Sequence, residues 1–327
     1  MKEKILITGA SGFIGTNALK YFCDKGFEVI NIDIKEPQNK DYISFWRKID
    51  ITDLSKFKKA VFDYKPDYIL HLAARTDLDG KTLEEYSANM IGVQNLMEIV
   101  HELPLLKKVV ITSSRFVCPN GYYPKDQFDY APHTLYGESK VITEKNVWDN
   151  KPLCDWAILR PTSIWGPWFG IPYRNFFDMV MARMYFHIGH KVCHKTYGYV
   201  ENTVYQIEQV LFKKTPDEDN KIYYIGDNVA YNIGEWADEI AKELGFRIIR
   251  MPYFIIKCAA WFGDFLRVFK LHFPMTSFRL HNMTTDNVND ISKINKLAPK
   301  PPYTRVEGVK VTLKWIKDKE KHNVNKI

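Results

Sequence analysis

The sequence predicts an α/β fold, built as a doubly wound parallel sheet followed by a smaller mixed α/β region. Three observations predict it. An apolar run at residues 5–7 breaks into a turn with glycine at 9, 12 and 15, and a helical pattern follows at 16–22. A second apolar run ends in Asp33, about 20 residues beyond the glycines. Further apolar runs alternate with helical patterns, as they do in successive βαβ units.

The turn after the first strand has the composition of a pyrophosphate-binding loop. One glycine allows the tight turn, one lets the backbone approach the ligand, and one lets the helix pack close to the strand. The helix N-terminus adds N–H donors and the positive end of the helix dipole. An ordinary glycine-rich turn is the alternative. In the dinucleotide interpretation, the contacts come from Gly9, Ser11, Gly12, Phe13, Ile14 and Gly15.

Asp33 stands where a carboxylate would hold the ribose hydroxyls of an adenosine. It favours NAD, because a carboxylate repels the 2′-phosphate of NADP. Lys35, two residues later, would soften that preference. Asp50 and Ile51 follow a predicted third strand at 44–49. An acid there faces the adenine amino group or, alternatively, caps the next helix.

Composition excludes several classes of protein. The 327 residues are 46% hydrophobic and 26% charged, which is ordinary for a globular chain. The net charge of +7 indicates a solvated basic face or a preference for anionic small molecules. Because no nucleic-acid-binding motif is present, we expect no nucleic acid partner. Five scattered cysteines without metal-type pairs indicate reduced thiols, no metal site and a cytoplasmic protein. We expect no signal peptide, since the chain runs directly into its first strand.

The segment 251–273 is the most apolar late stretch. Lys257, Asp264, Arg267 and Lys270 interrupt it, so we expect no transmembrane helix. Its pattern suits an amphipathic helix that either packs on the core or touches a membrane or a partner.

The strand at 68–74 ends in small residues that would let a flat ligand lie against the backbone, namely Leu72, Ala73 and Ala74. His71 in the same strand is expected to be packed rather than catalytic. Asn89 lies within an apolar helical pattern at 84–102, where a buried amide needs partners. The strand at 108–114 ends in hydroxyls, at the edge where open α/β sheets bind ligands.

Tyr136 and Lys140 open a later helix and are four residues apart, so they project from one helical face. A phenol with a pKa near 10 cannot act as a base at neutral pH unaided. An adjacent ammonium group and a positive nicotinamide ring would lower that pKa. A surface pair on an amphipathic helix is the alternative. The upstream glycine turn, Asp33 and the hydroxyl-ended strand favour a site.

After a strand at 156–161 the chain becomes irregular and rich in aromatic residues. We place a dinucleotide-binding domain at 1–165 and a mainly substrate-binding region at 166–327. The apolar run at 223–225 is expected to return to the first sheet.

The order of these motifs resembles the extended short-chain dehydrogenase/reductases, the NAD-dependent epimerase/dehydratase family. The matching stretches are 8–15, Asp33, 50–51, 71–74, Asn89, 112–114, 136–140 and 159–162, with looser matches at 195–202 and 290–293. The resemblance implies a Rossmann-type domain holding NAD, a C-terminal region holding a nucleotide-diphosphate sugar, and a homodimer formed through the helices after His71 and at Tyr136. It also implies that Pro161, Asn89, Tyr136 and Lys140 contact the cofactor.

The resemblance assigns roles residue by residue. Tyr136 would be the catalytic base, Lys140 would tune its pKa and anchor the ribose, and Ser114 would bind the reacting hydroxyl. Lys195 and, on weaker grounds, Arg279 would bind the diphosphate, with surface ion pairs as the alternative. Further substrate contacts are expected from the loops that carry Arg75, Arg115 and Asn175.

The departures from the family pattern narrow the chemistry. Ser114-Arg115-Phe116 lacks the acids of the dehydratases and the glutamate of the decarboxylases. Cys118 falls on the family's tyrosine position, which favours a packed thiol over a catalytic one. The sequence therefore predicts an epimerase. A reductase of a 4-keto nucleotide sugar, a dehydrogenase of another secondary alcohol, and a non-catalytic NAD sensor or scaffold are the alternatives.

Overall fold

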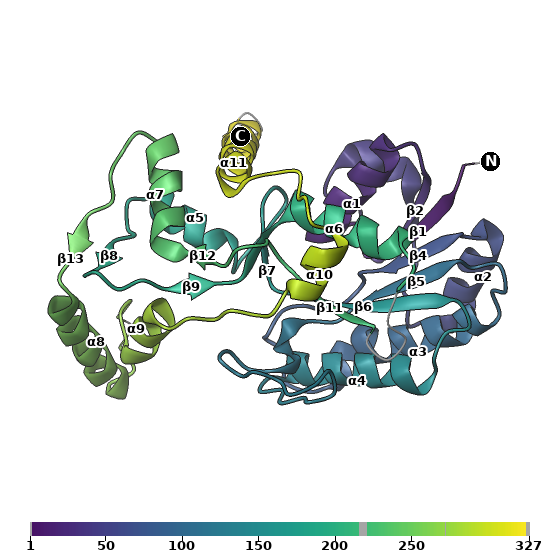
Figure 1. Ribbon diagram of the computed structural model, residues 1–327, viewed down its shortest axis with the longest axis horizontal. Coiled ribbons are helices and arrows are strands. Elements are labelled where there is room, and N and C mark those ends of the chain that lie inside the picture. The colour runs from purple at the N-terminus through teal and green to yellow at the C-terminus, as the bar shows by residue number, and fades with distance from the viewer. Residues whose placement is uncertain (1, 216–220, 272, 325–327) are drawn as a thin grey trace. The chain divides into compact units, whose positions relative to one another are not determined.

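The computed structural model describes residues 2–215, 221–271 and 273–324. Two compact units divide the chain. Unit 1 comprises 1–169, 198–228 and 290–302, and unit 2 comprises 170–197, 229–289 and 303–327. The chain thus enters and leaves each unit more than once (Figure 1).

Unit 1 is built around a parallel sheet. Within the described residues, seven strands join it in the order β11-β6-β5-β4-β1-β2-β3. Their bounds are β1 Lys4–Thr8, β2 Glu28–Asp33, β3 Trp46–Lys48, β4 Tyr68–His71, β5 Lys108–Thr112, β6 Asp155–Pro161 and β11 Ile222–Ile225. The strand order reverses between β1 and β4, and ligands bind at such a switch point in doubly wound sheets. The return of β11 beside β6 confirms the prediction for 223–225.

Helices cover both faces of this sheet (Figure 1). Alternate strand residues point to opposite faces, so Ile5 and Ile7 join one core and Leu6 joins the other. The first core lies under α1, α6 and α10, and the second under α2, α3 and α4. The helix bounds are α1 Phe13–Asp24, α2 Leu54–Tyr64, α3 Ser87–His101, α4 Leu135–Asp149, α6 Val200–Phe212 and α10 Ser292–Leu297. The shorter elements of unit 1 are the 3₁₀ helices η1 Lys40–Phe45, η2 Glu84–Tyr86 and η3 Arg115–Val117, and the strand β7 Ser163–Trp165. Strand β10 Tyr197–Tyr199, which pairs with β7, begins at the last residue of a unit 2 segment and continues into unit 1.

The third strand is shorter than its predicted range of 44–49. Residues 44 and 45 belong to η1, whose N-cap Asn39 accepts a hydrogen bond from the Asp41 N–H. This capped turn holds the chain out of the sheet until Trp46.

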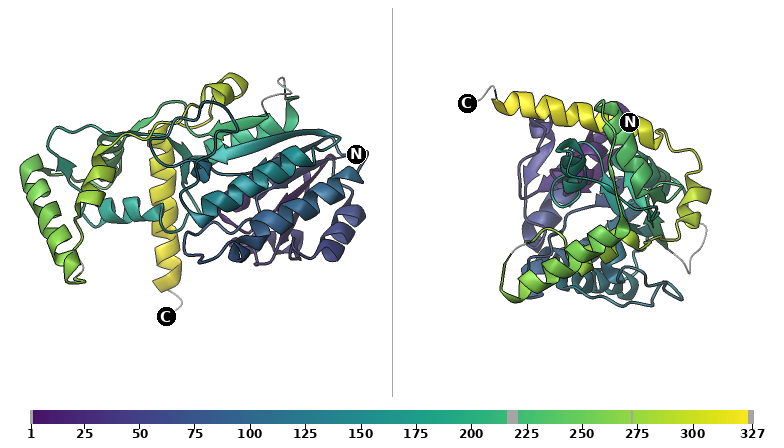
Figure 2. Two further views of the ribbon diagram at one scale, coloured as in Figure 1. Left: turned by 90° about the horizontal axis from the view of Figure 1, so that it is seen from below. Right: turned by 90° about the vertical axis from the view of Figure 1, so that its left-hand side faces the viewer.

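Unit 2 is mixed and mostly helical. Its elements are α5 Arg174–Met181, β8 His187–Ile188, β9 His194–Lys195, β12 Tyr231–Asn232, α7 Ile233–Glu243, β13 Arg250–Met251, α8 Tyr253–Val268, α9 Ser277–Thr284 and α11 Arg305–Val324. Trp236 on α7 is buried and stacks on Phe176 of α5, with ring centroids 4.5 Å apart. Helix α8 packs against α9, and Figure 1 shows the two side by side. Figure 2 shows the same structure from two further directions.

Candidate active site

Gly9 begins the site at the end of β1. Its φ of +75° is a left-handed conformation, and a Cβ there would lie 2.5 Å from the backbone nitrogen of Ala73. Only glycine meets both conditions. The Gly9 N–H donates to Ile32 O at 2.9 Å, which links the turn to β2. The absence of a side chain at Gly9 is therefore what lets the ends of β1, β2 and β4 meet.

Gly12 and Gly15 differ in how much space the structure leaves for a side chain. A Cβ on Gly15 would lie 2.2 Å from Gly9 O, so helix packing requires this glycine. A Cβ on Gly12 would lie 3.2 Å from the same oxygen, and Gly12 itself is exposed. Gly12 is the N-cap of α1 and makes no side-chain cap. The open first turn of α1 is thus a cradle that a pyrophosphate fits, as the N–H groups and dipole of a helix N-terminus favour an anion.

Asp33 lies half-buried at the end of β2, beside this turn. Its carboxylate accepts the Ser11 N–H at 3.1 Å and the Lys35 N–H at 2.9 Å. Burial nevertheless raises the pKa of Asp33, and the two N–H donors oppose that shift. The Ser11 hydroxyl donates to Lys35 O at 2.7 Å. Ser11 therefore holds the segment that presents Asp33, and the carboxylate fits the adenosine ribose of a dinucleotide.

The ends of β1 and β4 are joined through side chains. Thr8 Oγ1 lies 2.9 Å from His71 Nδ1 and accepts the Ala73 N–H at 3.2 Å. Burial lowers the pKa of His71 to about 3, so the imidazole is neutral at pH 7. Its Nε2 has no hydrogen-bond partner among the described residues. His71 is packed, as the sequence predicts, and Leu72, Ala73 and Ala74 follow it half-buried at the sheet edge.

Three of the predicted cofactor residues make hydrogen bonds within the protein, namely Asp50, Ile51 and Asn89. Asp50 is exposed and accepts both the N–H and the hydroxyl of Thr52, while Asp53 is the N-cap of α2. Ile51 is buried, and its O accepts Asn95 Nδ2. Asn89 is fully buried: its Oδ1 accepts the Arg75 N–H at 2.8 Å, and its Nδ2 donates to Arg75 O and Ser139 Oγ. Asn89 thus holds the backbone of the loop after β4. Direct contact of Asp50, Ile51 and Asn89 with a cofactor stays a prediction.

Ser114 and Tyr136 approach each other through η3. Ser114 is buried after β5, and its Oγ accepts the Phe116 N–H at 3.1 Å. The Phe116 ring meets the Tyr136 ring edge-on at 5.8 Å. Gly137 makes this possible, because a Cβ there would lie 2.3 Å from Phe116 O. Sequence reasoning missed the part played by Gly137, although its position next to Tyr136 was a signal.

Lys140 lies one turn after Tyr136 and is buried. Its Nζ donates to Thr112 O at 2.9 Å, at the end of β5. Burial lowers its pKa from 10.5 to about 7, against the opposing effect of Glu144. With a pKa of about 7, Lys140 is only partly protonated at neutral pH, and its charge, where present, acts strongly in this buried site. Pro161, at the end of β6, completes this row of strand ends.

A buried ionic network behind the site was missed by sequence reasoning. Glu144 and Arg160 form an ion pair of 2.7 Å and are almost completely buried. Glu144 also accepts the hydroxyls of Ser113 and Tyr130. Arg160 also donates to Gln127 O at 2.8 Å. The position of Glu144, four residues after Lys140 on one helical face, was a weak signal of a buried acid. The spacing could not show that Arg160 is its partner.

The predicted substrate residues are distributed over both units. In unit 1, Arg75 is held by Asp77 and Glu85, and the buried Arg115 donates to Asn120. In unit 2, Asn175 is exposed on α5, Lys195 Nζ donates to Asn282 O at 2.7 Å, and Arg279 donates to Pro274 O at 2.9 Å. Substrate binding by these five side chains stays a prediction.

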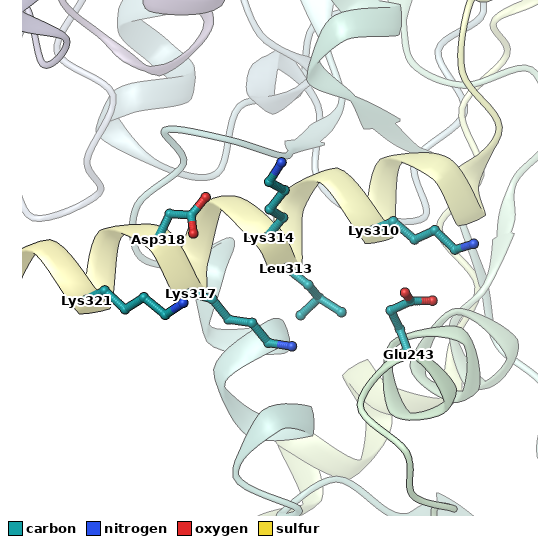
Figure 3. A pocket seen from close by; sticks show the side chains of 7 residues that line it. All are labelled: Glu243, Lys310, Leu313, Lys314, Lys317, Asp318 and Lys321. Atoms are coloured by element: carbon teal, nitrogen blue, oxygen red, sulfur yellow. The ribbon is translucent and has the colours of Figure 1, made fainter.

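A hollow of about 310 Å³ lies in unit 2 between α7 and α11. Figure 3 shows that lysine side chains from α11 line it, together with Glu243 of α7. It contains none of the predicted site residues. The part of the chain that the structure describes has no helix long and apolar enough to cross a membrane, and no cluster of side chains that could hold a metal ion.

The comparisons with known proteins agree with this geometry. The family described as NAD dependent epimerase/dehydratase matches residues 5–226. An N-acetyl-alpha-D-glucosaminyl-diphospho-ditrans,octacis-undecaprenol 4-epimerase of Escherichia coli O157:H7 is 24% identical over 323 residues, which cover 96% of each chain. A 3-beta-hydroxysteroid dehydrogenase of Mycolicibacterium neoaurum is 27% identical over 266 residues, which cover 75% of this chain and 71% of that one.

The fold is shared with solved epimerase structures. The UDP-glucuronic acid 4-epimerase of Bacillus cereus, solved in complex with UDP-glucuronic acid and NAD, superposes with a TM-score of 0.69 at 19% identity. The match covers 96% of this chain and 99% of the other. The glycine cradle, Asp33 and the family match together make the chain a member of the NAD-dependent epimerase/dehydratase family of extended short-chain dehydrogenase/reductases, and an NAD-dependent enzyme.

Proposed function

We propose that this enzyme is an epimerase of a nucleotide-diphosphate sugar and works through a transient keto intermediate. The observation that carries the proposal is the set Ser114, Tyr136 and Lys140 at the carboxyl edge of the sheet, with Lys140 buried beside the end of β5. A dehydratase would need acids beside Ser114, whereas Arg115 and Phe116 occupy those positions.

Each residue of this set has a separate task. Ser114 Oγ holds the sugar hydroxyl that reacts. The Tyr136 oxygen removes the proton of that hydroxyl and later returns it, so the reaction involves no net loss of protons. The Lys140 ammonium group stabilises the tyrosinate by charge. NAD, when bound, supplies the hydride acceptor and donor. The sugar must turn between the two halves of the reaction for the configuration to change.

Replacing Tyr136 by phenylalanine tests the mechanism. The variant should lose turnover by a factor of about 10² or more, since it lacks the general base, while it keeps its NAD. Tyr42→Phe, which removes a hydroxyl from η1, is the matched control and should retain turnover. Products from UDP-glucose, UDP-glucuronic acid and UDP-N-acetylglucosamine are resolved by chromatography. Full turnover in Tyr136→Phe would refute the assigned base.

The second candidate is a reductase or dehydrogenase, and the similarity to the 3-beta-hydroxysteroid dehydrogenase favours it. The two functions differ in how the cofactor is used. An epimerase recycles its NAD, whereas a reductase exchanges it in every cycle. Mass spectrometry of the dinucleotide released by denaturing the purified protein distinguishes them. Near-stoichiometric NAD supports the epimerase, and an empty site that prefers NADPH supports the reductase. Absence of turnover on every sugar substrate would revive the non-catalytic sensor or scaffold.

The diphosphate is proposed to meet Lys195 and Arg279. Lys195→Ala should raise KM for a nucleotide-diphosphate sugar with little change in kcat, because a ground-state contact is removed. Lys242→Ala on α7 is the control for a lost surface charge. Unchanged affinity would remove Lys195 from the site. The E. coli relative is named for a sugar whose diphosphate is attached to undecaprenol instead of a nucleoside. The assay therefore also includes a sugar linked through diphosphate to a polyprenol. The homodimer also stays a prediction, tested by the mass of the protein in solution.

A further inference from the structure

Helix α8 turns an aromatic surface away from the protein. We name this surface the aromatic face; its large side chains are 40–77% exposed, with Trp261 at 58% and Phe254 at 66%. The residues of the aromatic face are Phe254, Ile255, Cys258, Trp261, Phe262, Phe265, Val268 and Phe269. Single exposed apolar residues are ordinary, but a continuous apolar stripe of this kind marks an interaction site.

The opposite side of α8 is the one that packs. Ile256, Ala260 and Gly263 are buried, and a Cβ on Gly263 would lie 1.8 Å from Met275 O. Phe265 follows Ile256 by nine positions, so at about 100° per residue the two lie on opposite sides of the helix. The lack of a side chain at Gly263 therefore lets α8 pack closely against the segment before α9. This packing leaves the aromatic face outward, whereas a helix of a globular protein normally buries its larger apolar residues.

Lys257 lies beside the aromatic face, and further basic residues lie near the end of α8 and on α9. Between 253 and 279 the chain carries Lys257, Arg267, Lys270 and Arg279 against the single acid Asp264. The Asp264 carboxylate accepts the Ser277 N–H at 3.2 Å, so it is engaged at the junction with α9. Lys257 Nζ lies 5.0 Å from the centroid of the Trp261 ring. Aromatic residues flanked by cations are the arrangement of helices that lie in the headgroup layer of a membrane.

The positive charge near the aromatic face favours an anionic lipid surface over a second copy of the protein as the partner that covers it. A second copy seated on the aromatic face by two-fold symmetry would bring two sets of the same cations together, which is unfavourable. An anionic lipid surface is complementary to them, and each cation near it contributes about 1 kcal/mol. We propose that α8 docks the protein on the surface of a bilayer that contains anionic lipids, with the aromatic face inserted among the headgroups. Because no described helix crosses a membrane, this attachment is peripheral.

Flotation with vesicles tests the proposal on the full-length protein. The wild type should float with phosphatidylglycerol–phosphatidylcholine vesicles and bind much less to phosphatidylcholine alone. The double variant Trp261→Glu/Phe265→Glu should lower partitioning roughly tenfold or more, since two aromatic side chains no longer insert. Leu105→Glu/Leu153→Glu is the matched control, because these side chains are 87% and 80% exposed elsewhere on the protein. It should float like the wild type.

A second variant distinguishes the contribution of positive charge to membrane binding from the contribution of aromatic insertion. Lys257→Gln/Arg267→Gln/Lys270→Gln keeps the aromatic face and should lose the preference for phosphatidylglycerol. High salt should weaken wild-type binding in the same way. Wild-type protein that fails to float, or a Trp261→Glu/Phe265→Glu variant that floats equally well, would overturn the proposal. So would a wild-type dimer that does not float and that this variant converts to a monomer, since a second copy would then cover the face. Epimerase turnover on soluble substrates is a separate readout, so failure of the proposed catalysis is distinguishable from failure of docking.

Discussion

Replacing Lys140 by methionine is expected to stabilise the NAD-free protein while abolishing its activity. The lysine is buried, and burial lowers its pKa from 10.5 to about 7. Below pH 7 the lysine is charged in the native state as well, so the full cost of removing this charge from water opposes folding. As pH rises from 7 towards 10.5 the native lysine loses its proton while the unfolded one keeps it. The cost therefore falls with increasing pH.

The magnitude follows from the shift in pKa. A difference of about 3.5 units corresponds to a cost of about 4 kcal/mol at pH 7 and about 2 kcal/mol at pH 9. Methionine has a similar shape but cannot donate to Thr112 O, which removes about 1 kcal/mol. We therefore expect Lys140→Met to raise the free energy of unfolding by about 3 kcal/mol at pH 7 and by about 1 kcal/mol at pH 9.

Urea unfolding followed by circular dichroism at both pH values measures this difference. Lys108→Met is the matched control, because Lys108 is also buried but pairs with Asp155 at 2.9 Å. Its loss leaves a carboxylate short of a partner and should destabilise the protein. A gain in Lys140→Met that is equal at pH 7 and pH 9 would contradict the desolvation argument, since better packing alone does not depend on pH. A destabilised Lys140→Met would refute it outright.

Three further predictions concern the turn, the buried histidine and the ionic network. Gly15→Ala should unfold the turn and abolish NAD binding, whereas Gly12→Ala should keep the fold and weaken NAD binding. Thermal melting and calorimetric titration with NAD measure both effects. Equal effects of the two substitutions would contradict the assigned roles. The pKa of His71 lies at about 3 in the native protein and 6.5 otherwise, so stability should fall by up to about 5 kcal/mol as pH drops from 6.5 to 3, and His71→Gln should flatten that dependence in urea unfolding. Glu144→Gln should cost about 3–5 kcal/mol because it leaves the Arg160 charge buried without its partner, and a loss below 1 kcal/mol would show that the pair is not desolvated.

Local patterns were enough to predict the dinucleotide half of this protein. The glycine spacing, the acid that ends β2, and Tyr136 and Lys140 one helical turn apart are all relations between near neighbours in the sequence. Backbone conformation and helical periodicity turn such spacings directly into geometry. The close approach of Gly9 to Ala73 also follows from pairing β1 with β4, which the parallel order implies.

Other features depend on which distant segments meet. The pairing of Glu144 with Arg160 requires α4 and β6 to lie beside each other, and the fully engaged amide of Asn89 depends on the backbone of Arg75 and the hydroxyl of Ser139. No spacing in the sequence encodes these contacts.

Helix α8 shows the same division. The sequence by itself predicted an amphipathic helix in an apolar segment interrupted by charged residues, and it left open whether that helix packs on the core or touches a membrane or a partner. Only the tertiary structure decided that Ile256, Ala260 and Gly263 are buried on the side of α9 and that the aromatic face points outward. The physical reason is that periodicity determines which residues share a face of a helix, whereas the shape of the neighbouring segment determines which face is buried.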